Sequence, residues 1–477
     1  MIKHGILCSI CVVMLSACTI GPNFEKPLFG LEESSWINGG NTDENYVTKA
    51  AVEEEWWGSL NDPVLSALID QAVQTNIDLK IAQANLERAD ALLSQARSGL
   101  FPGVDAEGAI TRRQLSEGSG IPTGPFNPRI QNFYDVDLLA NWELDIFGGT
   151  RREIAAAYAR YESLEEQKRD TLLMILSEVA RNYIEMRGAQ QRERIILNNI
   201  ALQEKTAALV KRRFDAGEAN EFDYGRAQAQ LQSTKARLPN IDGQIDTLIY
   251  RLSVLAGQPP EALLAELSPP KALPVNPDIV RVGLRSDLLR RRPDIRAAER
   301  NLEAEVNDIG AATAELFPQF TLTGGWGFES IGSDDFISSS SETWQIGPGL
   351  RWPIFSAGRI RAQINAEEAD AERAALEYEQ TILLALEDAE AAFVQYGREL
   401  ETRTQLKETV QIRMRNVELA RKRYDKGLDS LIALIDTERE LLASEEELIA
   451  SETELLLKLV RLYKSLGGSW QVFEVKQ

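Results

Sequence analysis

The side chains that most often carry catalysis are nearly absent from this chain of 477 residues. It contains a single histidine, His4, and only three cysteines, Cys8, Cys11 and Cys18. All of these except Cys18 lie in an N-terminal segment that we expect to be removed. The mature chain would then lack Ser-His-Asp and Cys-His catalysis, histidine-ligated metal sites and any intrachain disulfide. The groups that remain for chemistry are carboxylates.

The N-terminal segment predicts export and lipidation. A positive residue precedes a short apolar run from Ile6 to Leu15, which is too short to span a bilayer as a helix. Leu15-Ser16-Ala17-Cys18 resembles a bacterial lipobox, in which small side chains precede a cysteine that carries lipid. We expect cleavage before Cys18, then a diacylglyceryl group on its thiol and an acyl group on its amine. The alternative is an ordinary secretory leader in which this cysteine is incidental.

The residue after the cysteine bears on the choice of membrane. In the lipoproteins that the lipobox resembles, an aspartate at this position retains the protein at the inner membrane. Thr19 stands there in this chain. We therefore expect the protein to reach the outer membrane.

The overall composition excludes two further classes of protein. Hydrophobic residues make up 44% of the chain, which argues against wholesale disorder. The net charge is −21, from 52 Lys and Arg against 73 Asp and Glu. Binding to nucleic acid needs clustered basic residues, so this acidic balance argues against a nucleic-acid partner.

The chain contains two copies of one plan. Leu100-Phe101-Pro102 recurs as Leu316-Phe317-Pro318, and Arg213-Phe214-Asp215-Ala216-Gly217 recurs as Arg423-Tyr424-Asp425-Lys426-Gly427. Both spacings are about 210 residues, which indicates duplication of one structural unit. From these signals we predict a signal peptide (1–17), a lipidated N-terminal tether (18–61), a first repeat (62–256), a Pro-rich linker (257–287), a second repeat (288–466) and a C-terminal tail (467–477).

Each repeat predicts one very long helix. Residues 129–238 and 354–477 contain no proline, so long helices are allowed in both places. An apolar stripe with steps of three and four residues runs from Ala375 to Leu400. A helix from Arg359 would exceed sixty residues and extend roughly 100 Å.

Short stretches before these helices predict strands. Between Tyr134 and Ile146 every second residue is apolar, and the residues between them include four carboxylates, Asp135, Asp137, Glu143 and Asp145. Stretches 104–111, 319–328 and 344–354 alternate in the same way. This period fits either a half-buried soluble sheet or a membrane barrel with lipid outside and water inside.

A barrel interpretation requires more than one copy of the chain. Four strands cannot close a membrane barrel, because known barrels begin at eight strands. Open edges in lipid leave backbone N–H and C=O groups unpaired at a cost of several kcal/mol each. Composition does not decide between two and three copies.

Several motifs taken together resemble a known family. They are Cys18-Thr19-Ile20-Gly21-Pro22-Asn23-Phe24, Trp56-Trp57 followed by Asp62-Pro63, Leu289 to Asp294, Leu316-Phe317-Pro318 and the two R-[FY]-x-x-G motifs. Their order and spacing resemble the TolC-like outer-membrane factor family, in its OprM/NodT lipoprotein branch. The resemblance implies an α+β membrane protein with a duplicated strand–helix repeat. Three chains would form a twelve-stranded outer-membrane β-barrel, four strands from each, continued by a long periplasmic α-helical barrel. The tether, linker and C-terminus would form an equatorial belt.

The same resemblance implies a function without catalysis. Such proteins are the exit ducts of tripartite efflux pumps, and they export small molecules such as drugs. The implied partners are two further copies of the chain, a periplasmic adaptor, an inner-membrane transporter of the resistance-nodulation-division (RND) type and outer-membrane lipid. No cofactor is expected beyond the covalent lipid on Cys18.

The resemblance also implies a gate at the periplasmic helix tips, beside Gly217 and Gly427. Matching the family motif places an apolar ring at Ile432 and a carboxylate ring at Asp436, with Arg439 one turn further on. The spacings i, i+4 and i, i+3 put these side chains on one helix face. Asp429 is a weaker gate candidate because it fits the turn.

Two simpler interpretations concern the same residues. Asp436 and Arg439 can be a solvated charge pair on a helix face. In the first repeat, Asn220 and Asp223 are expected to be helix caps. On the strands, Asp135, Asp137, Glu143 and Asp145 are expected to face the lumen and to favour cations.

Two alternatives from other classes stay open at this point. The first is a periplasmic structural or adhesive lipoprotein built on coiled coils, without a pore. The second is a lipid-anchored hydrolase that uses paired carboxylates, although no acid pair here has a recognisable glycosidase or metal-site pattern.

Overall fold

The computed structural model describes residues 19–27, 47–48, 52–116, 118, 122, 124, 128–277, 279–283 and 285–474. Within them the chain forms two compact units. The first takes in residues 86–164 and 297–378 with the N-terminal segment 19–27, and the second takes in the described parts of 28–85, 165–296 and 379–477. The predicted leader and Cys18 lie outside the described residues.

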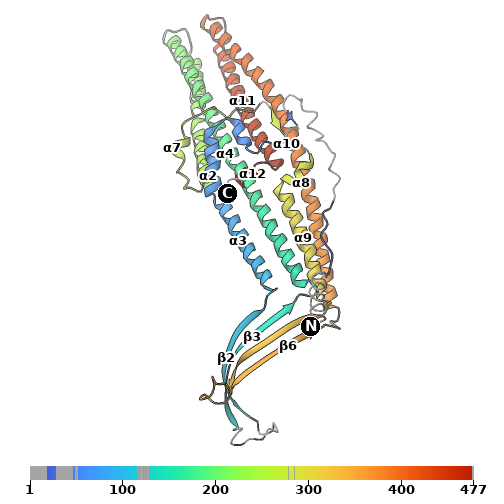
Figure 1. Ribbon diagram of the computed structural model, residues 1–477. Helices are drawn as coiled ribbons and strands as arrows, with labels where there is room; N and C mark the ends of the chain where they lie inside the picture. The colour runs from blue at the N-terminus through green and yellow to red at the C-terminus, as the bar shows by residue number, and fades with distance from the viewer. Residues whose placement is uncertain are drawn as a thin grey trace. The chain divides into compact units, whose positions relative to one another are not determined.

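Helices dominate the described residues, and the strands form one larger sheet and one short pair (Figure 1). The α-helices are α2 (Pro63–Thr75), α3 (Ile77–Ser98), α4 (Gly149–Asp215), α5 (Glu221–Lys235), α6 (Leu238–Leu255), α7 (Leu264–Leu267), α8 (Leu288–Arg291), α9 (Pro293–Ala314), α10 (Arg359–Asp425), α11 (Leu431–Ser465) and α12 (Gln471–Glu474). Short 3₁₀ turns cover η1 (Trp56–Leu60) and η3 (Arg285–Asp287). The strands are β1 (Val47–Thr48), β2 (Gly103–Gln114), β3 (Ile130–Leu144), β4 (Val280–Arg281), β5 (Gln319–Ser330) and β6 (Glu342–Arg351). No helix among the described residues combines the length and the apolar character that crossing a membrane requires.

The duplication predicted from sequence is confirmed in the element order. A helix of 22 residues, two strands and a helix of 67 residues follow one another twice, as α3-β2-β3-α4 and as α9-β5-β6-α10. The predicted apolar stripe is the buried face of α10, where Tyr378, Phe393 and Tyr396 are almost fully buried. The expectation of helices longer than sixty residues is therefore confirmed.

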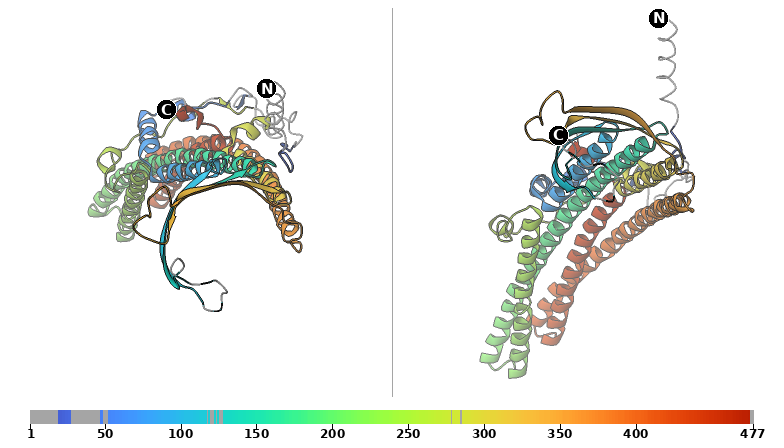
Figure 2. Two further views of the ribbon diagram at one scale, coloured as in Figure 1. Left: turned by 60° about the horizontal axis from the view of Figure 1, so that its bottom comes forward. Right: turned by 90° about the horizontal axis from the view of Figure 1, so that it is seen from below.

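The first unit contains the four-stranded sheet, in the order β2-β3-β5-β6, with every neighbouring pair antiparallel. Figure 2 shows that the sheet is strongly curved. The outer edges of β2 and β6 pair with no further strand of the described residues. The strands end earlier than the alternation predicts, at Leu144 and Arg351.

One arginine of α4 contacts the N-terminal segment at three places. Arg152 donates to the carbonyl oxygens of Ile20 (3.1 Å) and Gly21 (3.2 Å) and to Oδ1 of Asn23 (2.8 Å). Gly21 adopts φ of 94°, and a Cβ there would lie 2.4 Å from Cα of Gly310. Only glycine satisfies both conditions, which explains its place in the N-terminal motif.

The second unit packs its core around aromatic residues. Trp56 stacks on Tyr463 with ring centroids 5.4 Å apart, and Trp57 stacks on Phe473 at 5.8 Å. The hydroxyl of Tyr183 donates to Asp62, which also caps α2 through the backbone N–H of Val64. The Trp-Trp motif therefore belongs to the core of this unit, and Asp62 of the Asp-Pro motif links the start of α2 to Tyr183.

Helices of the second unit meet end to end at two places. Asn76 accepts at Oδ1 from the backbone N–H groups of Asp78 (2.8 Å) and Leu79 (3.2 Å), so it caps the start of α3. Its Nδ2 donates to the carbonyl of Leu255 (2.9 Å), the last residue of α6. At the corresponding junction in the second repeat, Arg292 precedes α9 and donates to the carbonyl of Ser465, where α11 ends.

Candidate functional site

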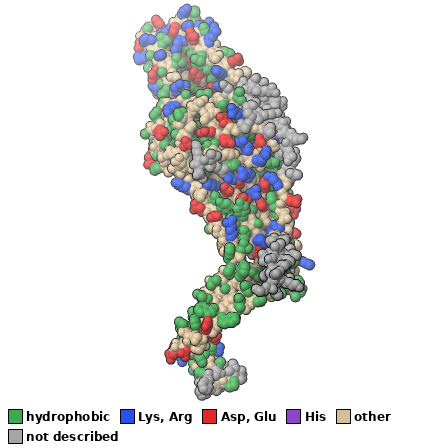
Figure 3. All heavy atoms as spheres, in the orientation of Figure 1, with side chains coloured by type: hydrophobic (Ala, Val, Ile, Leu, Met, Phe, Trp, Pro, Cys, Tyr) green, Lys and Arg blue, Asp and Glu red, His purple; other side chains and the backbone are tan. Residues whose placement is uncertain are grey.

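The register of the sheet puts apolar side chains on one face. Residues opposite each other on neighbouring strands share a face, and alternate residues of one strand point the same way. The apolar side chains of this face are Val104, Ala106, Ile110, Tyr134, Val136, Leu138, Ala140, Trp142, Leu144, Phe320, Leu322, Trp326, Phe328, Trp344, Ile346, Pro348 and Leu350, and Arg112 and Glu342 join them near strand ends. Several of these are largely exposed, among them Ile110 at 77% and Trp344 at 73%. Figure 3 shows hydrophobic side chains gathered over the strands.

An exposed apolar surface of this extent decides between the two interpretations of the alternation. A soluble sandwich would bury such a face against a second sheet. Within the described residues, the four strands form a single layer and pair with no other strand. Lipid is the surrounding that stabilises this face.

The opposite face of the sheet is polar and acidic. Its polar and acidic side chains are Asp105, Glu107, Thr111, Asp135, Asp137, Asn141, Glu143, Thr321, Thr323, Glu329, Thr343 and Gln345, and it also carries Leu139 and, near strand ends, Arg113 and Arg351. Glu107 lies opposite Asp137, and Asp135 lies opposite Glu329. Like charges placed directly opposite destabilise a sheet unless water and cations screen them. This face is therefore suited to a wet, cation-rich space.

The predicted lumen residues Asp135, Asp137 and Glu143 do share this polar face. Sequence reasoning placed Asp105 and Glu107 among the alternating polar residues of their strand but did not assign them or Glu329 to the lumen, and all three belong to the same face. The same alternation in the shorter strands was the signal that could have found the missed residues.

Asp145 requires a correction. It follows the end of β3, and its carboxylate accepts from the backbone N–H groups of Thr150 (3.2 Å) and Arg151 (3.0 Å). Nε of Arg151 donates to it as well, at 2.9 Å, and the side chain is only 9% exposed. Asp145 thus caps the start of α4 and is neutralised by Arg151, so it is not an open charge of the polar face.

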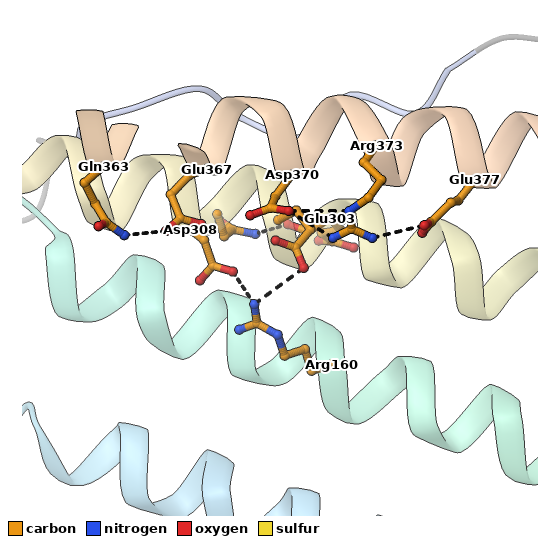
Figure 4. Close-up of polar contacts among 10 residues, drawn as sticks. Arg160, Glu303, Asp308, Gln363, Glu367, Asp370, Arg373 and Glu377 are labelled. Atoms are coloured by element: carbon orange, nitrogen blue, oxygen red, sulfur yellow. Dashed lines mark hydrogen bonds and ion pairs between the residues drawn. The ribbon is translucent and has the colours of Figure 1, made fainter. Parts of the chain in front are cut away.

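The helices of the first unit carry a network of ion pairs (Figure 4). Arg160 of α4 pairs with Asp308 and, at 3.8 Å, with Glu305 of α9. On α10, Arg373 pairs with Asp370 (3.2 Å) and Glu377 (3.0 Å). One carboxylate oxygen from each of Glu305, Asp308 and Glu367 lies within 4.8 Å of the other two, and Arg160 offsets part of their charge.

A groove beside this network extends its acidic character. It is lined by Glu143, Glu153, Arg160 and Asp308 among others. Burial raises the pKa of Glu153, and the nearby charges of Glu143 and Asp145 raise it further.

The two helix hairpins of the second unit turn in the same way. In each R-[FY]-x-x-G motif the glycine has positive φ, 75° at Gly217 and 69° at Gly427. The N–H of Glu218 donates to the carbonyl of Arg213 (2.8 Å), and that of Leu428 donates to Arg423 (2.9 Å). This geometry satisfies the last carbonyls of α4 and α10, and only glycine adopts it without strain.

The caps that start the next helices differ between the hairpins. Asn220 accepts from the N–H of Asp223 (2.7 Å), so the expectation that Asn220 is a cap is confirmed, whereas Asp223 supplies the capped N–H. In the second hairpin Ser430 accepts from the N–H of Ala433 (3.3 Å). Each hairpin thus restarts its helix with a polar cap three residues after the glycine.

The structure brings three of the four predicted gate residues together. Ile432, Asp436 and Arg439 line one groove with Phe222 and Arg226 of α5. Nη1 of Arg439 lies 3.9 Å from Oδ1 of Asp436, and both side chains are about 60% exposed. A pair this long and this exposed contributes little to stability.

Asp429 does not join this group. Its carboxylate pairs with Nε of Arg423 at 3.1 Å and accepts from the N–H of Ser430 at 3.0 Å. It belongs to the turn, as its position in sequence suggested.

Comparison with known proteins adds the family. The profile described as outer membrane efflux protein matches residues 68–258 and 284–468. The solvent efflux pump outer membrane protein SrpC of Pseudomonas putida is 30% identical over 468 residues, which cover 97% of each chain. Nodulation protein T of Rhizobium leguminosarum bv. trifolii is 29% identical over 436 residues, 90% of each. The structure of the outer-membrane channel OprN superposes with a TM-score of 0.88 at 34% identity, covering 95% of this chain and 100% of OprN.

These similarities extend through both repeats and include the strands and the long helices. The chain therefore belongs to the outer membrane efflux protein family, and it is a transport channel of the outer membrane.

Proposed function

We propose that three copies of this efflux channel close into one tube. Each copy supplies β2, β3, β5 and β6 to a twelve-stranded barrel in the outer membrane, and the long helices continue the tube in the periplasm. The observation that carries this proposal is the sheet, which is apolar on one face, acidic on the other and unpaired at both edges within the described residues. Joining the β6 edge of one copy to the β2 edge of the next satisfies the backbone groups that lipid cannot.

The tube would serve as the exit duct of a tripartite pump. A periplasmic adaptor and an inner-membrane RND transporter are the proposed partners, and small molecules such as drugs are the proposed cargo. The relative SrpC is described as part of a solvent efflux pump, which supports this assignment. The transporter supplies the energy, so the proposal includes no catalytic step. A coiled-coil lipoprotein without a pore would have no use for the apolar sheet face.

A lipid on Cys18 would add a second attachment to the membrane. The residues that follow it, from Thr19 onward, are fastened to α4 through Arg152 in the same unit as the sheet. This placement supports an anchor beside the barrel. Because the lipids are covalent, no dissociable cofactor is part of the proposal.

The gate is assigned to Ile432, Asp436 and Arg439 at the tips of α10 and α11. Three copies of Asp436 around a narrow axis would concentrate negative potential and bind cations. We expect Asp436→Ala to raise the conductance of the trimer in planar bilayers and to weaken blockade by multivalent cations. Unchanged conductance together with unchanged blockade would contradict the gate assignment.

The architecture can be tested apart from the gate. Electron microscopy of the purified oligomer is expected to show a hollow cylinder with three-fold symmetry and a barrel at one end. A compact monomer would contradict the tube.

A further inference from the structure

A buried polar layer lies behind the tips of the helix hairpins, between α4, α10 and α11. Its members Gln203, Thr206 and Glu438 are exposed by only 2%, 5% and 1%. One helical turn from Thr206 and from Glu438, on the same helices, Val210 and Leu434 are fully buried in the hydrophobic core. A carboxylate in such a place is costly, because burial favours its neutral form.

One oxygen of Glu438 joins all three helices. Oε1 of Glu438, on α11, accepts from Oγ1 of Thr206 on α4 at 3.0 Å and from Nη2 of Arg421 on α10 at 2.9 Å. Nη2 of Arg421 also lies 3.4 Å from Oγ1 of Thr206. Burial raises the pKa of Glu438, and the bonds from Thr206 and Arg421 oppose the rise. The carboxylate is held in place by those two partners.

The same layer contains an unsatisfied group. Gln203 lies one helical turn before Thr206, and neither atom of its amide meets a hydrogen-bond partner among the described residues. Such a group raises the free energy of the packed arrangement, and it regains hydration when the helices part. The layer is therefore less stable in the packed state than an apolar layer would be.

Glu438 also has a fixed relation to the gate residue Asp436. Two residues along an α-helix correspond to a rotation of about 200°. Accordingly Asp436 is 59% exposed while Glu438 is 1% exposed on the opposite side of α11. Holding Glu438 against α4 and α10 thus sets the direction in which Asp436 points.

We propose that Glu438 is the positioning residue of the gate, and that its bridge to Thr206 and Arg421 holds α11 in the closed arrangement. This inference rests on the proposed function and names the side chain that regulates the same site. When the bridge breaks, α11 separates from α4, water reaches Gln203, and the Asp436 ring widens. No contact of Glu438 with cargo is involved.

The test compares matched variants of the full-length trimer in planar bilayers. Glu438→Gln keeps the shape of the side chain and removes its charge, and Thr206→Val removes the hydroxyl. We expect each to raise the fraction of time spent open at least about fivefold, the lower end of ordinary coupling energies. In the double variant, the open fraction should rise by less than the product of the two single-variant increases, because both substitutions break the same bridge. Glu440→Gln, an exposed residue of the same helix, should leave the open fraction unchanged.

The outcomes separate this inference from the gate itself. If Asp436→Ala alters conductance while both Glu438→Gln and Thr206→Val behave as the parent chain, the gate stands and the positioning role is overturned. If all three behave as the parent chain, the gate assignment fails as well. A lower melting temperature with unaltered open fraction would show a purely structural role and also overturn the proposal. Should Glu438→Gln fail to assemble, Thr206→Val alone decides.

Discussion

Carboxylates with similar sequence surroundings do different work in this protein. Asp137 lies on the polar face of the sheet, opposite Glu107. Asp145, a few residues further along the chain, caps α4 and forms an ion pair with Arg151. At the tips, Asp436 is exposed whereas Glu438 is buried in a bridge between helices. The role of each acid is set by its neighbours in space.

This difference predicts distinct effects on ion selectivity. At ~10 Å through water one unit charge is worth about 0.4 kcal/mol, so losing three carboxylates per trimer should lower cation preference severalfold. We expect Asp137→Asn to show this lower cation preference when reversal potentials are measured in a salt gradient. Asp145→Asn should leave the reversal potential unchanged and lower stability by about 1 kcal/mol through the lost cap. Anion preference in the parent chain would refute the assignment of the polar face.

At this scale the sequence predicts which face of an element a residue lies on better than it predicts which residues its side chain contacts. Alternation identified the side of the sheet on which Asp135 and Asp137 lie. It misassigned Asp145 because alternation does not mark the residue at which a strand ends and a cap begins. Glu438 was missed because a glutamate in an acidic helix looks solvated, and its partner Thr206 lies 232 residues away.

At the scale of elements, long helical stretches of the chain arise in two ways. The helices α4 and α10 are continuous over 67 residues. The others are joined from two pieces, α6 to α3 through Asn76 and α11 to α9 through Arg292. At the first joint the side chain of Asn76 satisfies backbone groups of both helices, which would otherwise be orphaned at the ends. At the second joint Arg292 donates to the carbonyl of Ser465 and to the carboxylate of Asp294 in the first turn of α9.

Asn76 offers a clean test of such a joint. Asn76→Ala removes the cap of α3 and the donor to Leu255, and we expect it to lower the free energy of unfolding by about 2 kcal/mol. Asn76→Ser keeps an uncharged capping acceptor for α3 but loses the amide that donates to Leu255, so its loss should be smaller. Denaturant unfolding of the detergent-solubilised protein measures both. If the variant that keeps the cap were as stable as the parent chain, the bond to Leu255 would contribute nothing.

The helices and strands were largely predictable, whereas the joints were not. Absence of proline and the period of the apolar stripe predicted α10, because both are local properties of the chain. The bond from Asn76 to Leu255 links residues 179 apart in sequence, and no local pattern reveals it.

At the scale of the whole molecule, the two-faced sheet sets the surroundings that the protein requires. One face favours lipid and the other favours water and cations. The edges at β2 and β6 add the need for neighbours, because unpaired backbone groups in hydrocarbon are costly.

Neighbouring leucines on opposite faces test this view. Leu138 lies on the apolar face and Leu139 on the polar face. Leu138→Arg should cost roughly 2–4 kcal/mol per chain near the bilayer midplane and reduce the yield of trimer in outer membranes. Leu139→Arg, on the water-facing side, should assemble at nearly the parent level. Heat-modifiable migration on gels measures both, and equal yields would contradict the assignment of faces.

The number of copies was beyond the reach of the sequence alone. Alternation gives the strands of one chain, and closure demands more strands, but two or three chains satisfy that demand equally well on composition. The family resemblance, rather than any residue pattern, supplied the number three.

The unpaired edges and the apolar face of the sheet have a consequence for biogenesis. A newly exported chain is not stable in water as a folded monomer. Its unpaired strand edges would pair with strands of other chains, and the protein would aggregate. The fold can be completed only after periplasmic chaperones have bound the chain, or after the chain has met other copies of itself at the membrane. Assembly of the native protein therefore depends on the concentration of other copies of the chain.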